Sequence, residues 1–286
     1  MIKDLRGTNA ILTGASRGLG IPIALALANE GVNLTLAARS AEGLEKVRAS
    51  VEERGVRAIV VPTDVADRAQ LDALVETSQR ELGPTDILVN NAGIEATYPY
   101  DEYPPDEIEK LIEVNLTAPM LLTRIVLPGM LDRGRGHIVQ IASLAGKGGF
   151  SLQAPYAASK SALIMFSHCL RAELVDSPVD CSAVCPGFVA DEGMYADMVT
   201  QTGVKASRLL GESSPEKVAK AVIKAIKRGS SELFVNPAPM RPVIILGQMF
   251  PDVVPRVLKV FGVTALARRV ASIQKGAAYT GEAEPR

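Results

Sequence analysis

The sequence predicts an α/β fold: a doubly wound parallel sheet of about seven strands with helices on both faces, followed by a helical carboxyl-terminal extension. Two observations favour it. Along the 286 residues, short apolar runs alternate with longer segments of helical periodicity, which is the pattern of repeated β-α-β units. The first apolar run leads into a glycine-rich turn, Thr13–Gly20, and then into a helical segment, which is how such sheets commonly begin.

The predicted elements follow each other in a regular order. Strands are expected at Ala10–Thr13, Asn33–Ala37, Ala58–Pro62, Ile87–Val89, His137–Ala142, Cys181–Cys185 and Leu233–Val235. Helices are expected at Gly18–Asn29, Ala41–Arg54 and Arg68–Leu82, each closed by a nearby glycine, and further long helices precede Gly136 and follow Pro155. Right-handed crossovers place these helices on both faces of the sheet. The long connection Pro186–Ser214 is expected to cover a ligand.

Composition and charge limit the classes of function. A formal net charge of −1 argues against nucleic acid as a partner. The charged amino terminus leads directly into a strand, so no signal peptide is expected. No apolar run approaches the roughly 18 residues that span a membrane. We expect a cytoplasmic protein with a catalytic domain at residues 1–236 and a dependent extension at 237–286.

The cysteines and histidines predict no metal site. The chain has three cysteines without a Cys-x-x-Cys motif, and its two histidines are isolated in the sequence. This usage fits a reducing compartment. Cys169, Cys181 and Cys185 are expected to be small buried residues, and His137 and His168 to be structural.

The glycine-rich turn predicts a phosphate-binding loop. Its glycines allow backbone conformations and close approaches that a Cβ would forbid. The helix that follows offers the positive end of its dipole, which suits a pyrophosphate. The predicted cofactor contacts are Gly14, Ser16, Arg17, Gly18, Leu19 and Gly20. The spacing is Gly-x-x-x-Gly-x-Gly, and a tight structural turn is the alternative interpretation.

The end of the second strand indicates which dinucleotide is preferred. An acidic residue there would bind the adenosine ribose and repel a 2′-phosphate. This chain has Arg39 and Ser40 instead, with Arg17 available from the glycine loop. Two guanidinium groups and a hydroxyl suit the additional phosphate of NADP. We therefore predict NADP(H) in preference to NAD(H); two solvated surface arginines are the alternative.

Ser143, Tyr156 and Lys160 together predict a proton-transfer site. Tyr156 and Lys160 are four residues apart, so they share one face of a helix. A nearby ammonium favours the phenolate and lowers the pKa of a tyrosine towards working pH, where an acid/base is most useful. Ser143, delivered from the preceding strand, could bind the oxygen that gains or loses the proton. Taken alone, a Tyr-x-x-x-Lys pair also arises by chance on helix surfaces.

These motifs, taken with three others in order and spacing, resemble the short-chain dehydrogenase/reductase family. The others are Asn90-Asn91-Ala92-Gly93 after the fourth strand, Asn115 in the following helix, and Pro186-Gly187 after the sixth strand. The resemblance covers roughly Leu5 to Asn236. It implies a Rossmann-like fold and an NADP(H)-dependent oxidoreductase that interconverts a carbonyl and a secondary alcohol, with dimers or tetramers as its common assemblies.

The resemblance also implies roles for individual residues. Asp64 and Val65 would contact the adenine, Asn91, Ala92 and Gly93 would line the cofactor, and Pro186, Gly187 and Val189 would lie on its nicotinamide side. Tyr156 would be the acid/base, Ser143 would hydrogen-bond the substrate oxygen, and Lys160 would bind the nicotinamide ribose. Asn115 would hold a water of the proton relay, or bridge helices. One departure is Asp191, which stands where the family often has a threonine.

The sequence indicates the substrate less clearly than it indicates the cofactor. Phe150, Leu152, Met194, Tyr195 and Met198 favour a hydrophobic carbonyl or alcohol, or else belong to the core or to a lid. A 3-oxoacyl thioester reductase is one alternative. A non-catalytic NADP-responsive binding or regulatory protein is another.

The extension differs from the rest of the chain in charge and pattern. Pro242–Leu246 is apolar, and Val254, Leu258, Phe261 and Ala265 recur at helical spacing among Arg256, Lys259, Arg268 and Arg269. Two alternatives stay open. The segment packs on the catalytic domain near the substrate cleft or a subunit interface, or it lies on an anionic membrane surface.

Overall fold

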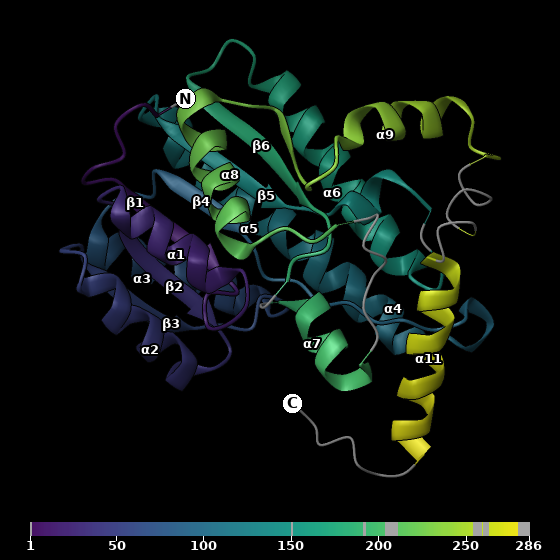
Figure 1. The fold of residues 1–286 in the computed structure, drawn as a ribbon. Helices are drawn as coiled ribbons and strands as arrows, with labels where there is room; N and C mark the ends of the chain where they lie inside the picture. Colours follow the sequence, from purple (N-terminus) through teal and green to yellow (C-terminus); the bar gives the residue numbers. More distant parts are fainter. Residues whose placement is uncertain are drawn as a thin grey trace.

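The computed structural model describes residues 2–149, 151–190, 193–203, 211–253, 259 and 263–279 of the chain. Seven parallel strands form one sheet in the order β3-β2-β1-β4-β5-β6-β7 (Figure 1). The strands are β1 (Asn9–Thr13), β2 (Asn33–Ala38), β3 (Ala58–Pro62), β4 (Ile87–Asn90), β5 (Gly136–Ile141), β6 (Val179–Pro186) and β7 (Glu232–Val235). The predicted doubly wound sheet is confirmed.

The topology brings two predicted loops to one place. The chain fills β1 to β3 in one direction and then crosses to fill β4 to β7 in the other, so the strand order reverses between β1 and β4. Ligands of open α/β sheets bind beyond the carboxyl ends of the strands at such a reversal. The glycine loop after β1 and the Asn91–Gly93 loop after β4 therefore lie together.

Several elements differ slightly from their predicted bounds. β5 begins one residue early because Gly136 pairs with Val179, and β6 is longer at both ends because Pro186 still pairs with Val235. The first helix, α1 (Gly20–Asn29), begins two residues later than predicted. Gly18 has a φ of +56°, which lies outside the right-handed helical region.

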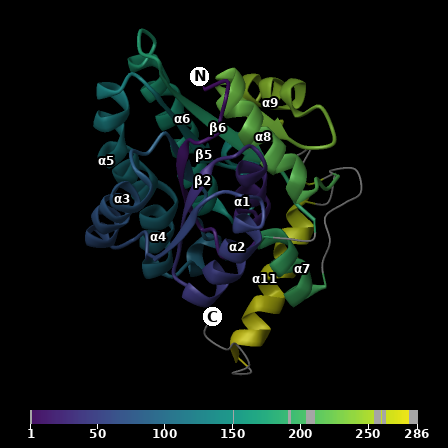
Figure 2. The same cartoon turned by 90° about the vertical axis from the view of Figure 1, so that its left-hand side faces the viewer.

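One face of the sheet is covered by three helices, as Figure 2 shows edge-on. These are α1, α2 (Ala41–Glu52) and α8 (Pro215–Arg228). Ile23 and Leu27 of α1 and Val222 of α8 are fully buried against the sheet. This core is what fixes α1, and with it the end of the glycine loop.

The opposite face carries α3 (Arg68–Leu82), α5 (Ala118–Asp132) and α6 (Ala154–Glu173) (Figure 2). These helices contribute to a second buried hydrophobic cluster, which includes Leu74 of α3, Val126 of α5 and Leu170 of α6. The Asp67 side chain caps α3 by accepting hydrogen bonds from the first-turn backbone amides. Because α6 carries Tyr156 and Lys160, its packing on β5 and β6 sets their position.

A helical stretch from Pro105 to Asp132 joins three segments: α4 (Pro105–Ile112), a π-helical turn η2 (Glu113–Thr117) and α5. Among the described residues, this stretch is long and apolar enough by length and composition to cross a membrane, and 44% of its apolar window is buried in the protein. The expectation that no apolar run approaches that length is thus wrong. Core helices of soluble proteins pass the same test, so the feature is weak evidence for a membrane span.

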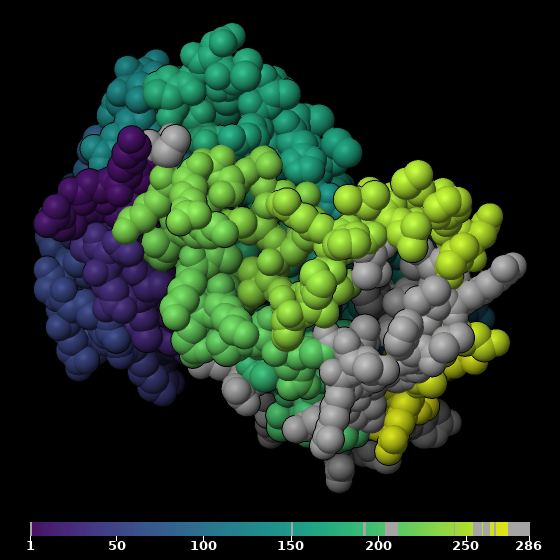
Figure 3. Space-filling view, turned by 45° about the horizontal axis from the view of Figure 1, so that its top comes forward, coloured from purple at the N-terminus to yellow at the C-terminus, as the bar shows by residue number. Residues whose placement is uncertain are grey.

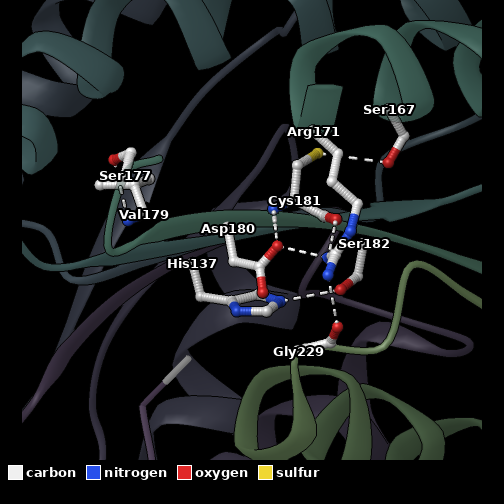
Figure 4. A network of polar contacts seen from close by, with 9 residues as sticks. All are labelled: His137, Ser167, Arg171, Ser177, Val179, Asp180, Cys181, Ser182 and Gly229. Atoms are coloured by element: carbon white, nitrogen blue, oxygen red, sulfur yellow. Dashed lines mark hydrogen bonds and ion pairs between the residues drawn. The ribbon is translucent and has the colours of Figure 1, made fainter. Parts of the chain in front are cut away.

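A polar network fastens the end of α6 to the sheet (Figure 4). Arg171 of α6 pairs with Asp180 and donates to the backbone carbonyls of Cys181, at 3.2 Å, and Gly229, at 2.8 Å. His137 Nε2 lies 2.9 Å from Ser182 Oγ across β5 and β6. Burial lowers the pKa of His137 to about 3, so it is neutral near pH 7.

The three cysteines differ in their exposure. Cys181 and Cys185 are buried as expected, whereas Cys169 is exposed. The prediction was wrong for Cys169 because α6 turns that position outward. His168 Nε2 lies 3.9 Å from Glu232 Oε2.

The carboxyl-terminal extension packs on the domain through two helices. Met240 and Ile244 of α9 (Met240–Met249) pack against a buried cluster at the β6 end of the sheet. In α11 (Val263–Tyr279), Val270 is buried, and the helix contacts α7 (Met194–Thr202). In Figure 3 this yellow segment lies on the opposite side of the molecule from the purple amino-terminal part.

The predicted apolar spacing of the extension is only partly covered by the described residues. Val254, Arg256, Leu258 and Phe261 lie outside them. Ala265 is exposed, whereas Val270 and Ala271 are buried, so the spacing did not identify the packed face of α11. Ser151 Oγ lies 3.3 Å from Thr264 Oγ1 and ties α11 to the loop before α6.

Candidate active site

A cleft of about 1570 Å³ lies at the carboxyl edge of the sheet. Loops after β1, β2, β4, β5 and β6 form its floor, and α7, α9 and α11 contribute to its walls. Its lining includes Gly14, Ser16, Arg17, Gly18, Leu19, Arg39, Ser40, Asp64, Val65, Asn91, Ala92, Gly93, Ser143, Tyr156, Lys160, Pro186, Gly187 and Val189. All of these come from the sequence prediction. Of the residues predicted to bind the cofactor or to take part in catalysis, all of which are described, only Gly20 and Asn115 are outside the lining.

The glycine loop, or cradle, packs so closely on its neighbours that side chains at two of its glycines would collide with them. Gly14 has a φ of +65°, and a Cβ there would approach Ala92 Cα to 2.8 Å. A Cβ on Gly20 would approach the carbonyl oxygen of Gly14 to 2.1 Å. Gly20 therefore serves close packing of α1 on the loop. Since no side chain caps α1 at Leu19, the positive end of this helix is directed at the cradle.

The loop after β4 is locked onto the end of β1. Asn91 Nδ2 donates to the carbonyl oxygens of Thr13, at 3.0 Å, and Gly14, at 3.1 Å. Thr13 Oγ1 in turn accepts from the backbone amides of Asn91 and Ala92, both at 3.0 Å. The Asn91 side chain thus acts on the shape of the cradle.

The end of β2 carries the groups predicted to prefer NADP. Arg39 is exposed at the cleft and forms no hydrogen bond or ion pair within the part of the chain that the structure describes. Ser40 caps α2, because its Oγ accepts from the Gly43 amide at 3.1 Å. Arg17 Nη1 forms an ion pair with Asp197 Oδ2 of α7 at 2.7 Å. Asp64 and Val65, at the end of β3, line the same part of the cleft.

Asn115 sits in the π-helical turn η2, fully buried. Its Oδ1 accepts from the Ile94 amide at 2.9 Å, and its Nδ2 donates to the Ile94 carbonyl at 2.8 Å and to Ser159 Oγ at 3.3 Å. The side chain therefore connects the loop after β4 to α6. π-Helical turns are frequent at functional sites. The predicted role of Asn115 in a water relay stays a prediction.

Ser143, Tyr156 and Lys160 converge from β5 and α6. Ser143 follows β5 and caps a short 3₁₀ helix, η3 (Leu144–Lys147), by accepting from the Ala145 amide at 3.1 Å. Lys160 Nζ donates to the Ile141 carbonyl at 3.0 Å and lies 5.9 Å from the centroid of the Tyr156 ring. Tyr156 is 6% exposed and Lys160 is 3% exposed. Both are thus removed from bulk solvent.

The pKa of Tyr156 is raised in the folded protein and the pKa of Lys160 is lowered, whereas a lowered Tyr156 pKa was expected. Burial and the Glu95 carboxylate raise the pKa of Tyr156, while a hydrogen bond with Ser143 opposes the change. Burial lowers the pKa of Lys160 to about 8. The expected lowering of the Tyr156 pKa by Lys160 is therefore not found, because desolvation penalises the charged forms of both groups.

Glu95 is a residue of this site that the sequence reasoning missed. It lies two positions after Gly93 and lines the cleft. The sequence could have indicated Glu95 only through its place next to Asn91–Gly93, the loop predicted to line the cofactor. Asp197, the partner of Arg17, was missed as well, because nothing in the sequence places α7 against the glycine loop.

The end of the cleft beyond Tyr156 is mainly apolar. Met194, Tyr195 and Met198 line it as predicted, joined by Met240 and Ile244 of α9 and Ala267 and Val270 of α11. Leu152 is not in this lining, which leaves the other alternative given for it, packing away from the substrate; its carbonyl accepts from the Tyr98 amide at 3.1 Å. Phe150 and Asp191 lie outside the described residues.

Sequence comparison now places the chain among known proteins. The family model described as short chain dehydrogenase matches residues 8–202. The chain belongs to the short-chain dehydrogenase family. It is accordingly an oxidoreductase, and its relatives include proteins named as reductases and as dehydrogenases.

Two short-chain dehydrogenase relatives span most of both chains. "Ketoacyl reductase HetN" of Nostoc sp. (strain PCC 7120) is 45% identical over 267 residues, which is 92% of this chain and 92% of that protein. The 2,3-dihydro-2,3-dihydroxybenzoate dehydrogenase of Bacillus subtilis (strain 168) is 34% identical over 227 residues, covering 79% of this chain and 83% of that protein.

A solved structure of the same family is also similar. It is a crystal structure of an actinorhodin polyketide ketoreductase variant with NADPH, and that chain is 33% identical to this one with a TM-score of 0.74. The match covers 80% of this chain and 95% of that chain. The Rossmann-like sheet with helices on both faces is thus shared with a known ketoreductase.

Proposed function

We propose that this short-chain dehydrogenase is an NADP(H)-dependent reductase of a hydrophobic ketone, with Tyr156 as the proton donor. The observation that carries the proposal is the convergence of Ser143, Tyr156 and Lys160 beside a glycine cradle in one cleft. Such a constellation can orient a carbonyl and protonate its oxygen. The ketoreductase with the similar fold supports the carbonyl as the substrate group.

A nicotinamide dinucleotide, when bound, supplies the hydride. The cradle of Gly14, Gly18 and Leu19 lines the cleft next to the start of α1, and its backbone would bind the pyrophosphate. Arg17 and Arg39 line the cleft and support binding of the 2′-phosphate of NADP. The residue after β2 is Arg39 and not a carboxylate, which would repel that phosphate. The NADPH in the similar ketoreductase supports the same preference.

The protein's own groups would manage the proton. Burial raises the pKa of Tyr156, so the phenol carries the proton that the substrate oxygen would receive during reduction. The Ser143 hydroxyl, held by η3, would donate a hydrogen bond to the same oxygen. Lys160 is fixed by Ile141 and would contribute positive charge when protonated.

A 3-oxoacyl thioester reductase is the second candidate within this chemistry. The name of the Nostoc relative, a ketoacyl reductase that matches 92% of this chain, favours it. The apolar wall from α7, α9 and α11 suits an acyl chain as well as a ketone.

A substrate panel tests both candidates. NADPH absorbance is followed with aliphatic ketones, cyclic ketones and acetoacetyl thioesters, and with the corresponding alcohols and NADP. Turnover of free ketones supports the first candidate, and turnover confined to thioesters supports the second. Cofactor binding without turnover of any compound would favour a non-catalytic NADP-responsive protein.

We further propose a peripheral membrane contact through α9 and the turn that follows it. Large apolar side chains of this segment point outward, with exposures of 45–67%: Ile245, Leu246, Met249, Phe250 and Val253. Leu246, Phe250 and Val253 also line the cleft, so this surface continues into the substrate site. Exposed Arg241, Lys259, Arg268 and Arg269 match an anionic surface in charge.

Vesicle sedimentation tests this contact. The full chain is expected to sediment with vesicles containing phosphatidylserine and to remain in solution with phosphatidylcholine alone. The variant Ile245→Glu/Met249→Glu should not sediment with either. Equal behaviour of both proteins with anionic vesicles would exclude the contact.

We also propose a homo-oligomer. Exposed Met120 and Leu131 on α5 and Met165 on α6 provide apolar surface on one side of the domain. A molar mass of a dimer or tetramer by light scattering is expected, and Met165→Glu should reduce it.

A further inference from the structure

Glu95 places an ionisable group in the substrate part of the cleft. It follows the loop after β4 and lines the cleft with Tyr156 and Lys160. Its chain neighbours Ile94 and Ala96 pack in an apolar cluster with Tyr103 and Tyr156. Glu95 itself is half-buried and lines the space that a substrate would enter.

Within the described residues, no hydrogen bond or ion pair involves the Glu95 side chain. It caps no helix and bridges no two elements. The Glu95 side chain is half-buried, and it lines the cleft. Burial raises the pKa of Glu95 to about 7, so the folded protein disfavours its ionised form. A structural role therefore does not explain this carboxyl.

The charged groups around Glu95 leave it available to a ligand. Lys160 favours its ionised form, but the Lys160 ammonium is already held by the Ile141 carbonyl. Asp197 of α7 disfavours the ionised form and is itself paired with Arg17. The negative charge of Glu95 contributes to raising the pKa values of Tyr103 and Tyr156. Tyr103 donates its hydroxyl elsewhere, to the Ala96 carbonyl at 3.0 Å.

We propose that Glu95 is a specificity-determining residue that binds a hydrogen-bond donor of the substrate, a hydroxyl or an ammonium group, away from the reacting carbonyl. This rests on the proposed ketone reduction. The substrate class is then a ketone with an apolar body, which contacts Met194 and Val270, and one donor group that reaches Glu95. A site built to bind such a group rejects analogues without it, because a bound analogue would cover the Glu95 carboxyl and leave it unpaired.

The test compares ketones that differ in one donor group. Cyclohexanone, 3-hydroxycyclohexanone, 4-hydroxycyclohexanone and 4-aminocyclohexanone are reduced with NADPH by the wild type, Glu95→Gln and Glu95→Leu. Asp101→Asn is the matched control, because Asp101 is an exposed carboxylate outside the cleft. Thermal unfolding and NADPH binding establish that each variant is folded.

The wild type is expected to show at least about a tenfold higher kcat/KM for one donor-bearing ketone than for cyclohexanone, mainly through KM. In Glu95→Leu this ratio should fall to about one. Glu95→Gln should retain a preference for a hydroxyl but lose one for an ammonium group, which distinguishes the two sources. Asp101→Asn should keep the wild-type ratio.

Three results would overturn the proposal. The first is a wild-type ratio near one for every ketone, and the second is an unchanged ratio in Glu95→Leu. The third is an equal change in kcat for all ketones with a shifted pH profile, which would make Glu95 a residue that adjusts Tyr156. If the wild type reduces none of the ketones, the proposed function fails, and calorimetry with 4-aminocyclohexanol still tests Glu95. At least about tenfold weaker binding to Glu95→Leu would support the proposal, and equal binding would refute it.

Discussion

Arg17 of the glycine loop and Asp197 of α7 form an ion pair, with 2.7 Å between Nη1 and Oδ2. The pair joins two segments that are far apart in the sequence and lie on one wall of the cleft. Gly18 and Gly193 approach closely at the same place, because a Cβ on Gly18 would lie 3.0 Å from Gly193 Cα. If Arg17 binds a cofactor phosphate, it must exchange Asp197 for that phosphate.

This exchange predicts that Asp197→Asn tightens NADPH binding. The substitution releases Arg17 and removes a negative charge beside the expected phosphate. Since exposed ion pairs are weak, the dissociation constant for NADPH should fall by about two- to fivefold. Fluorescence titration with NADPH measures it. NADH lacks the 2′-phosphate and is the internal control; an equal gain for both cofactors would contradict the exchange.

Arg39 predicts the complementary loss. It has a free guanidinium at the end of β2 among the described residues, so Arg39→Ala should remove a charge-assisted bond to the 2′-phosphate. The KM for NADPH is expected to rise by at least about tenfold. The KM for NADH should hardly change. Arg57→Ala is a matched control, because Arg57 is outside the cleft lining. An unchanged NADPH-to-NADH preference would show that Arg39 is only a surface residue.

Tyr156→Phe should separate chemistry from binding. The substitution keeps the ring but removes the proton donor, so kcat should fall by about 10²- to 10⁴-fold. NADPH affinity should remain close to that of the wild type. Tyr100→Phe provides the control, since Tyr100 is 69% exposed. Single-turnover absorbance with the best ketone of the panel is the measurement, and retained turnover would refute the role of Tyr156.

Glu95 predicts a pH-dependent stability that does not depend on activity. Its pKa is about 7 in the folded protein against an ordinary value of 4.5, so the folded state binds this proton more tightly. The contribution to folding is complete below the unfolded value and is lost as pH rises through about 7. Relative to the wild type, Glu95→Gln should therefore gain about 1–3 kcal/mol in the free energy of unfolding between about pH 5 and pH 8.

Urea unfolding at several pH values measures this difference. Asp101→Asn should show no such trend, because Asp101 is exposed. A constant difference between Glu95→Gln and the wild type across this range would mean that the carboxyl is well solvated in the folded protein.

The sheet and the cradle could be predicted because their signals are local. Apolar runs bounded by glycine located the strands, and Gly14 and Gly18 mark backbone conformations that other residues rarely adopt. Tyr156 and Lys160 share a helix face by their spacing alone. Strand ends such as Val179 and Pro186 were missed, because their pairing partners come from other strands.

The substrate end of the cleft was harder to predict. Met194 and Met198 lie in a long connection and line the cleft, whereas Leu152, for which the sequence left lining and core or lid packing open, lies outside the lining. The burial of Val270 could not be read from spacing, because it depends on where α11 meets α7.

The sequence by itself determined the parallel α/β fold, the dinucleotide cradle and the positions of Ser143, Tyr156 and Lys160, since each depends on residue type and short spacing. Only the tertiary structure decided the environment of these groups. It buries Tyr156 and Lys160, so that desolvation raises the pKa of Tyr156 and lowers the pKa of Lys160. It also pairs Arg17 with Asp197 across the cleft. Dielectric surroundings and long-range contacts are properties of the packed chain, which local sequence patterns do not encode.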